Sequence, residues 1–197
     1  MKFYEDNYFE NMTAGQKVLR FIWDLLKVVC VSLAIIIPVR YFLIQPFYVK
    51  GASMEPSFYD REYLIINELV YRFNDPGRGD IVIFKYPKDP SQYFIKRIVG
   101  LPGEKVEVKD NQVFVSQGGR KAMLDEAEYI GPSVRTFGDK SLQLGSDEYF
   151  VMGDNRDNSL DSRNFGPVAR EMIVGKVWLR GWPVWRLDVF ENVNYPK

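Results

Sequence analysis

The chain has 197 residues, contains no histidine and has a single cysteine, Cys30. These absences exclude Ser-His-Asp and Cys-His catalysis, the common histidine-based zinc sites and a disulfide framework. The 26 basic residues balance 26 acidic ones, so the composition argues against nucleic-acid binding. Without histidine, nucleophilic chemistry would need a lysine, a carboxylate or a terminal amine as its base.

The N-terminal part of the chain predicts a short cytoplasmic tail, residues 1–20, followed by a transmembrane helix, residues 21–44. The latter reads FIWDLLKVVCVSLAIIIPVRYFLI and would extend about 36 Å as a helix, enough for a hydrocarbon core of about 30 Å. A modest excess of positive charge before its apolar centre places the rest of the chain outside a plasma membrane. A buried core helix and a cleavable signal sequence are the alternatives, and the bulky residues after the run argue against cleavage.

Beyond the anchor, residues 45–197 are expected to form one domain of short β-strands separated by turn residues. The spacing of these runs favours an antiparallel sheet or a partly closed barrel over a βαβ fold. Residues 120–147 are the most polar and least periodic stretch, so we expect an insertion or loop there. The expected strands cover residues 63–67, 81–86, 93–99, 105–108, 112–115, 148–152 and 176–180.

A serine in a turn follows the apolar segment, within the sequence KGASMEPS. The small neighbours Gly51 and Ala52 leave the Ser53 hydroxyl accessible, and Pro56 stiffens the chain behind it. Most serines beside glycine and proline only serve turns, so the motif is weak on its own. Neither the S-x-x-K pattern nor the G-x-S-x-G elbow occurs here, and the serine would need another base.

A lysine can be that base only when it is neutral, which requires burial that lowers its pKa from about 10.4. Lys96 lies in an apolar run, where strand alternation places Phe94 and Ile98 on its own face. Arg97 is equally enclosed in the pattern, but arginine does not deprotonate in proteins. Lys85 ends its strand beside a turn and is expected to be solvated. The competing interpretation of Lys96 is a lysine that reaches out to solvent.

The sequence GDNRDNSLDSRNFGP, residues 153–167, is too polar for a core element. It is a long polar loop, a calcium loop or a scaffold held by its own charges. The calcium interpretation is disfavoured, because the pattern lacks the glycine and the final glutamate that such a loop needs. In the third interpretation Asp161 and Arg163 hold one another while the serines face an active site. We expect no metal and no other cofactor.

Four blocks follow the apolar segment in order: GASMEPSF, RGDIVIF, FIKRIVGLPG and MGDNRDNSLDSRNFGPV. Together they resemble type I signal peptidases, which are membrane-anchored serine proteases with a Ser–Lys dyad. The resemblance covers the functional half of the soluble domain and implies a mainly β catalytic domain of signal peptidase and LexA-like type. It also implies removal of signal peptides from exported preproteins, through an acyl-enzyme, after a small-x-small motif such as Ala-x-Ala.

The resemblance assigns roles to residues of this chain. It implies that Ser53 is the nucleophile, that Lys96 is the general base, and that a hydrogen bond from Ser159 orients the lysine. It also implies that Asp161 and Arg163 form the pair that fixes the polar loop.

The resemblance further implies an oxyanion site that contains the backbone N–H of Ser53. Some members add a serine hydroxyl two residues earlier, where this chain has Gly51, so a backbone group or a water has to serve as the second donor. The substrate is expected to bind as an added strand. The walls of its shallow pockets are expected to come from Val49, Met54, Phe58, Phe94 and Ile95.

The expected partners are preproteins with signal peptides and the lipid bilayer, and the protein itself is expected to be a monomer. Trp178, Trp182, Trp185 and Phe190 exceed what a small core requires, so we expect some of them to enter the membrane interface. Two other functions remain open. One is a membrane-anchored β-domain that binds a partner without catalysis, and the other is a self-cleaving protease like the LexA-like repressors, which lack a membrane span and carry a DNA-binding module.

Overall fold

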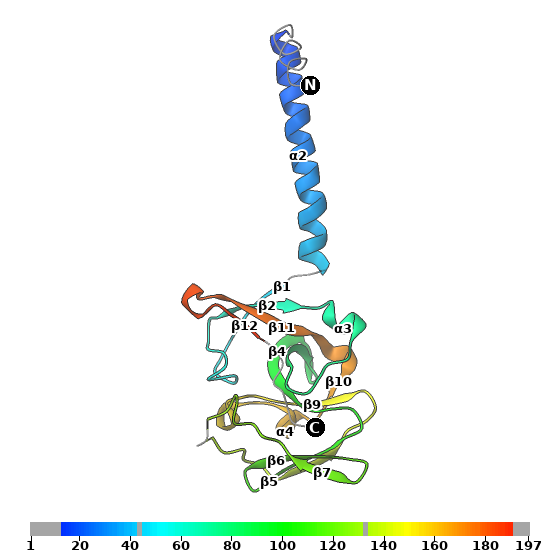
Figure 1. Cartoon of the computed structure of the whole chain (residues 1–197), viewed down its shortest axis with the longest axis vertical. Helices are drawn as coiled ribbons and strands as arrows, with labels where there is room; N and C mark the ends of the chain where they lie inside the picture. Colours follow the sequence, from blue (N-terminus) through cyan, green and yellow to red (C-terminus); the bar gives the residue numbers. More distant parts are fainter. Residues whose placement is uncertain (1–12, 43–44, 132–133, 191–197) are drawn as a thin grey trace. The chain divides into compact units, whose positions relative to one another are not determined.

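The structure is a computed structural model that describes residues 13–42, 45–131 and 134–190. The chain divides into two compact units, Met1–Leu43 and Ile44–Lys197. The described part of the first unit is one helix, α2 (Ala14–Phe42), and the second unit consists mainly of antiparallel strands (Figure 1). Each unit is a separate structural body, and the site described below lies within the second.

Helix α2 confirms the helical conformation predicted for the apolar segment. It begins at Ala14, earlier than residue 21, because Thr13 and Gln16 cap it: the Thr13 backbone N–H donates to Gln16 Oε1 at 3.0 Å. Residues 1–12 of the expected tail and the last two residues of the expected span lie outside the described residues. Within the described part of the chain no helix combines the length and the apolar character needed to cross a membrane, so the span stays a prediction.

The larger sheet has the strand order β1-β2-β11-β3-β4-β9-β10, with β12 paired to β11, and all its pairs are antiparallel. The predicted strands 63–67, 81–86 and 148–152 match it residue for residue. Its strands are β1 (Gln45–Tyr48), β2 (Tyr63–Asn67), β3 (Ile81–Tyr86), β4 (Asp89–Gly100), β9 (Glu148–Met152), β10 (Val168–Ala169), β11 (Ile173–Trp182) and β12 (Asp188–Val189).

The smaller sheet has the order β7-β6-β5-β8. Two of its strands fall in residues 120–147, so a loop was the wrong expectation for residues 120–123 and 140–143. Both strands carry mostly exposed, polar residues and are held by backbone pairing to β6 and β5, which leaves no apolar alternation in the sequence. The strands are β5 (Lys105–Lys109), β6 (Gln112–Gln117), β7 (Arg120–Met123) and β8 (Lys140–Gln143).

The two sheets meet across an apolar cluster that includes Val99, Phe150, Val106 and Val113. Gly100, at the end of β4, permits this close approach, because a Cβ there would lie 2.3 Å from Val106 Cγ2 and 2.9 Å from Phe150 Cβ. Two further clusters pack on the larger sheet. In the described residues the strand orders are linear and no barrel closes, so the mainly β, antiparallel class is confirmed in its open form.

Among the described residues of the second unit, five short helical segments accompany the strands. They connect strands and lie outside the sheets, and two of them, η1 and α4, shape the polar loop at residues 153–167. They are α3 (Val70–Phe73), η1 (Arg156–Asn158), α4 (Ser162–Phe165), η2 (Arg170–Met172) and η3 (Val184–Arg186).

Candidate active site

Ser53 lies in a turn that joins β1 to β2 and is closed at its base by the backbone. Val49 N donates to Glu62 O at 2.9 Å. Inside the turn, the Gly51 N–H donates to Asp60 Oδ1 at 2.8 Å. Gly51 has a φ of 86°, a conformation that glycine adopts without the steric cost of a Cβ. The turn therefore presents the serine from a fixed backbone.

Lys96 projects from the middle of β4 to the same place. Its Nζ lies 2.6 Å from Ser53 Oγ and 2.8 Å from Ile95 O, and the residue is only 3% exposed. Burial lowers the Lys96 pKa from 10.5 to about 8, although the charges of Asp161 and Asp154 act in the opposite direction. The two residues predicted to react are thus in hydrogen-bond contact, and the amine is far easier to deprotonate than an ordinary lysine.

The two competing bases are excluded by their surroundings. Lys85 is exposed at the end of β3. Arg97 is buried, but its Nε and Nη2 donate to Asp154 Oδ1 and Oδ2 at 2.9 and 2.7 Å. The Ser57 hydroxyl donates to the same carboxylate at 2.6 Å. One buried carboxylate of the polar loop therefore ties the strand that carries the lysine to the turn that carries the serine.

The predicted Asp161–Arg163 pair is present. Arg163 Nε and Nη2 donate to Asp161 Oδ1 and Oδ2 at 2.9 and 2.8 Å, a bidentate arrangement. Asp161 also caps α4 by accepting the Arg163 backbone N–H at 3.2 Å, and it accepts the Gly153 N–H at 3.2 Å. The carboxylate thus closes the polar loop on itself, in keeping with the scaffold interpretation.

A further buried ion pair of the loop was also not predicted. Arg156 donates to both carboxylate oxygens of Glu126, at 2.7 and 2.6 Å, and to Thr136 Oγ1 at 2.6 Å. Both partners belong to the stretch expected to be an insertion or loop, which here has a structural role. Their distance along the chain leaves no local sequence signal for the pairing.

Ser159 does not make its expected contact. Its Oγ is buried and has no hydrogen-bond partner among the described residues. The Lys96 amine bonds to Ser53 Oγ and Ile95 O. Ser159 nevertheless adjoins the site. A Cβ placed on Gly153 would lie 2.2 Å from Ser159 Oγ and 2.4 Å from Ser53 O.

A groove of about 400 Å³ opens beside the serine and the lysine, between residues 47–50 and residues 92–96. Of the predicted wall residues, Val49, Phe94 and Ile95 line it. Met54 and Phe58 are buried in the core instead. The chain after the nucleophile forms a tight turn, in which Phe58 N donates to Met54 O at 2.8 Å, and both side chains enter the core rather than the wall of the groove.

Asn155 is a further residue at the site that the sequence did not single out. Its Nδ2 donates to Ala52 O at 3.0 Å, and its backbone N–H donates to Ser53 O at 3.1 Å. Amide side chains are abundant in this loop, and nothing in the sequence indicates which of them meets the nucleophile. In the described part of the chain no cluster of three or more acidic or cysteine side chains could hold a metal ion.

Known proteins similar to this chain share most of its length. The family model "Signal peptidase, peptidase S26" matches residues 22–182. The chain is 38% identical over 174 residues to a probable signal peptidase I-2 of Synechocystis sp., covering 86% of this chain and 77% of the relative. It is 39% identical over 181 residues to signal peptidase I T of Bacillus subtilis, covering 87% and 90%. A crystal structure of a signal peptidase I from Enterococcus faecalis is 30% identical, covers 53% of this chain and 97% of that one, and has a TM-score of 0.44.

Proposed function

Because the chain belongs to the signal peptidase, peptidase S26 family, whose members are serine endopeptidases that remove signal peptides, we propose that Ser53 and Lys96 perform this cleavage as a catalytic dyad. The observation that carries the proposal is the 2.6 Å contact between Lys96 Nζ and Ser53 Oγ at a buried position. With a pKa of about 8, about a tenth of the lysine is neutral at pH 7.

In the proposed reaction Lys96 takes the proton of the Ser53 hydroxyl as Oγ attacks the scissile carbonyl carbon. The tetrahedral oxyanion accepts a hydrogen bond from the Ser53 backbone N–H. Lys96 then passes the proton to the leaving amine, and an acyl-enzyme remains. The same amine activates the water that hydrolyses the ester and regenerates the serine. No step requires a metal ion or a cofactor.

The groove supports an extended peptide as substrate. A signal peptide would lie as an added strand between residues 47–50 and 92–96, where main-chain hydrogen bonds hold it and side-chain pockets select it. Val49 and Ile95 would leave space for small side chains on either side of the dyad, which fits cleavage after a small-x-small motif of the Ala-x-Ala kind. A monomer is sufficient for this reaction, because the nucleophile, the base and the groove come from one chain.

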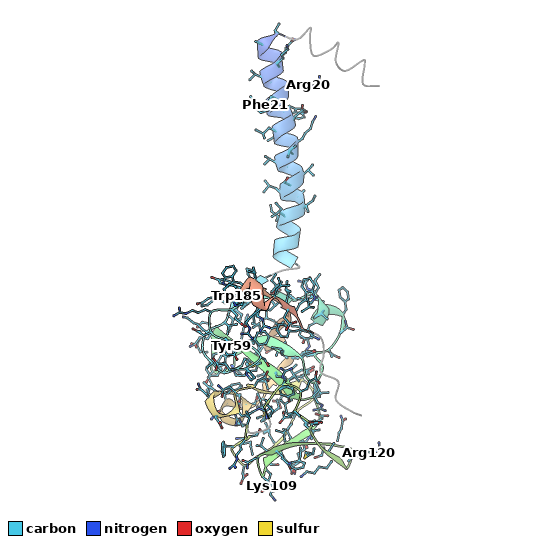
Figure 2. All side chains as sticks on the ribbon, turned by 60° about the vertical axis from the view of Figure 1, so that its left-hand side comes forward. Arg20, Phe21, Tyr59, Lys109, Arg120 and Trp185 are labelled. Carbon is cyan, nitrogen blue, oxygen red and sulfur yellow. The ribbon has the colours of Figure 1, made fainter. Side chains whose placement is uncertain are left out.

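Lipid is the second proposed partner. In the described part of α2, the large apolar side chains from Val18 to Ile37 are all exposed, as a helix embedded in lipid requires. In the second unit Trp178 and Trp182 are also exposed, and Trp185, on η3, is 77% exposed (Figure 2). We assign α2 the role of a plasma-membrane anchor with a cytoplasmic N-terminus, and the tryptophans that of contacts of an extracytoplasmic catalytic unit with the membrane interface.

Cleavage of a preprotein by the full-length protein in detergent tests the proposal. Wild type should release the mature protein, whereas Ser53→Ala and Lys96→Arg should not, because the guanidinium group cannot become neutral. Lys85→Arg is the matched control: this lysine is exposed at the end of β3, so activity should be retained. Cleavage by both dyad variants would refute the mechanism.

A further inference from the structure

One residue, Asn155, holds both peptide units that flank the nucleophile. Its Nδ2 donates to Ala52 O at 3.0 Å, and this oxygen belongs to the same peptide unit as the Ser53 N–H. Its own backbone N–H donates to Ser53 O at 3.1 Å, in the next peptide unit. Asn155 therefore constrains the backbone on each side of the Ser53 Cα.

This contact determines where the Ser53 N–H points. A trans peptide is planar, so its C=O and N–H point in opposite directions, and fixing one fixes the other. The Glu55 N–H also donates to Ala52 O, at 3.2 Å, so this carbonyl accepts two hydrogen bonds. Hydrogen bonds to a carbonyl also polarise the N–H of the same unit, which improves it as a donor to an anion.

Asn155 is itself held on both sides. Its neighbours Asp154 and Arg156 are buried, and each forms an ion pair with a distant residue, Arg97 and Glu126 respectively. These pairs fix the backbone of the polar loop immediately before and after the asparagine. The side-chain amide is therefore presented to the nucleophile turn from a rigid support, as a positioning group requires.

We propose that Asn155 is a positioning residue for the proteolysis proposed above, on which this inference rests: it aims the Ser53 N–H at the oxyanion of the tetrahedral intermediate. Gly51, two residues before the nucleophile, has no side chain and supplies no hydroxyl donor, so the orientation of the Ser53 N–H matters all the more for the oxyanion. Loss of a single oxyanion donor lowers kcat by about 10²–10³-fold, and loss of its orientation is expected to cost a substantial part of that.

The role makes a specific kinetic prediction. The groove holds the ground-state substrate. Ser53 Oγ and Ile95 O hold the base, Lys96. Asn155 instead bonds to the backbone that carries the oxyanion donor. Removing its amide should therefore lower kcat and leave KM and the pH dependence unchanged. A general disturbance of the site would alter all three.

The experiment compares full-length wild type, Asn155→Ala, Asn155→Asp and the control Asn158→Ala in detergent, with a peptide that contains an Ala-x-Ala site. Asn158 is exposed and ends the short helix η1, which Asn155 immediately precedes. We expect Asn155→Ala to lower kcat roughly 10–100-fold with KM within about twofold of wild type. The isosteric Asn155→Asp should be equally impaired, because its carboxylate cannot donate to Ala52 O. The control should match wild type.

A peptide aldehyde that ends in alanine supplies an independent readout. It adds to the serine hydroxyl as a tetrahedral adduct, so its affinity should fall in Asn155→Ala by the same factor as kcat/KM. Binding of the product peptide, which forms no oxyanion, should not change.

Three results for Asn155→Ala would overturn the inference. One is a kcat within about twofold of wild type, and another is a rise in KM as large as the fall in kcat. The third is a shift in the midpoint of the pH dependence of cleavage. Aldehyde affinity that does not follow kcat/KM would also count against it. If wild type itself fails to cleave while properly folded, the proposed function is refuted and the inference falls with it. If wild type and Asn155→Ala cleave equally, the inference alone is refuted.

Discussion

Replacing Lys96 with methionine should alter the pH dependence of stability as well as abolish cleavage. The lysine pKa is 10.5 in its ordinary state and about 8 in the folded protein. Each pKa unit corresponds to 1.36 kcal/mol, so the folded state disfavours the ammonium form by ~3 kcal/mol. Below pH 8 wild type bears this whole cost, whereas the methionine variant has no group to protonate.

The sign of the effect follows from proton binding. Because the folded-state pKa is the lower one, the unfolded chain binds more protons between about pH 8 and pH 10.5, and the stability of wild type rises with pH in this window. Other titrating groups contribute equally to both proteins and cancel in the difference. The free energy of unfolding of wild type minus that of Lys96→Met should therefore increase by ~3 kcal/mol between pH 7 and pH 10.5.

Urea unfolding of the full-length proteins in one detergent, followed by tryptophan fluorescence at several pH values, measures this difference. Lys85→Met is the control, because an exposed lysine should give a difference that does not change with pH. A difference in unfolding free energy between wild type and Lys96→Met that does not change with pH would refute the reasoning. So would a wild type that loses stability relative to the variant as pH rises.

Two further predictions concern the space around the nucleophile and the exposed tryptophans. Gly153→Ala should lower cleavage about 100-fold or more, because its Cβ would lie 2.4 Å from the backbone oxygen of Ser53. The control Gly145→Ala should remain active, because its Cβ would meet only the flexible side chain of Glu148. Replacing Trp182 and Trp185 together with serine should weaken binding of a chain that begins at residue 44 to lipid vesicles roughly 10–100-fold, measured by co-sedimentation. Unchanged vesicle binding would exclude these two tryptophans as membrane contacts.

The sequence predicted those strands whose side chains enter the core. The β3 run IVIFKY is buried over its first four residues, and β9 is buried over most of its length, so apolar content alone identified both. β7 and β8 are mostly exposed and exist through their hydrogen bonds to neighbouring strands. Such partners are set by the tertiary fold, and a strand without an apolar face leaves no local signal.

In the site, too, the sequence indicated the reactive residues but not the distant contacts that position them. Lys96 could be identified because a buried strand position lowers its pKa and because arginine cannot replace it as a base. The partner of Arg97 is Asp154, 57 residues away in the chain, and no spacing rule joins them. The sequence indicated the turn after the nucleophile, but not that this turn directs Met54 and Phe58 into the core.

The most direct test of the central claim is titration of the Lys96 amine itself. Nuclear magnetic resonance of full-length protein labelled with carbon-13 at the lysine Cε position, with the signal assigned by its loss in Lys96→Met, follows the protonation of this one group. A midpoint near pH 8 is the predicted result. A midpoint near the ordinary lysine value of about 10.4 would show that the neutral form of Lys96 is almost absent at the pH of the reaction and would contradict its assignment as the base.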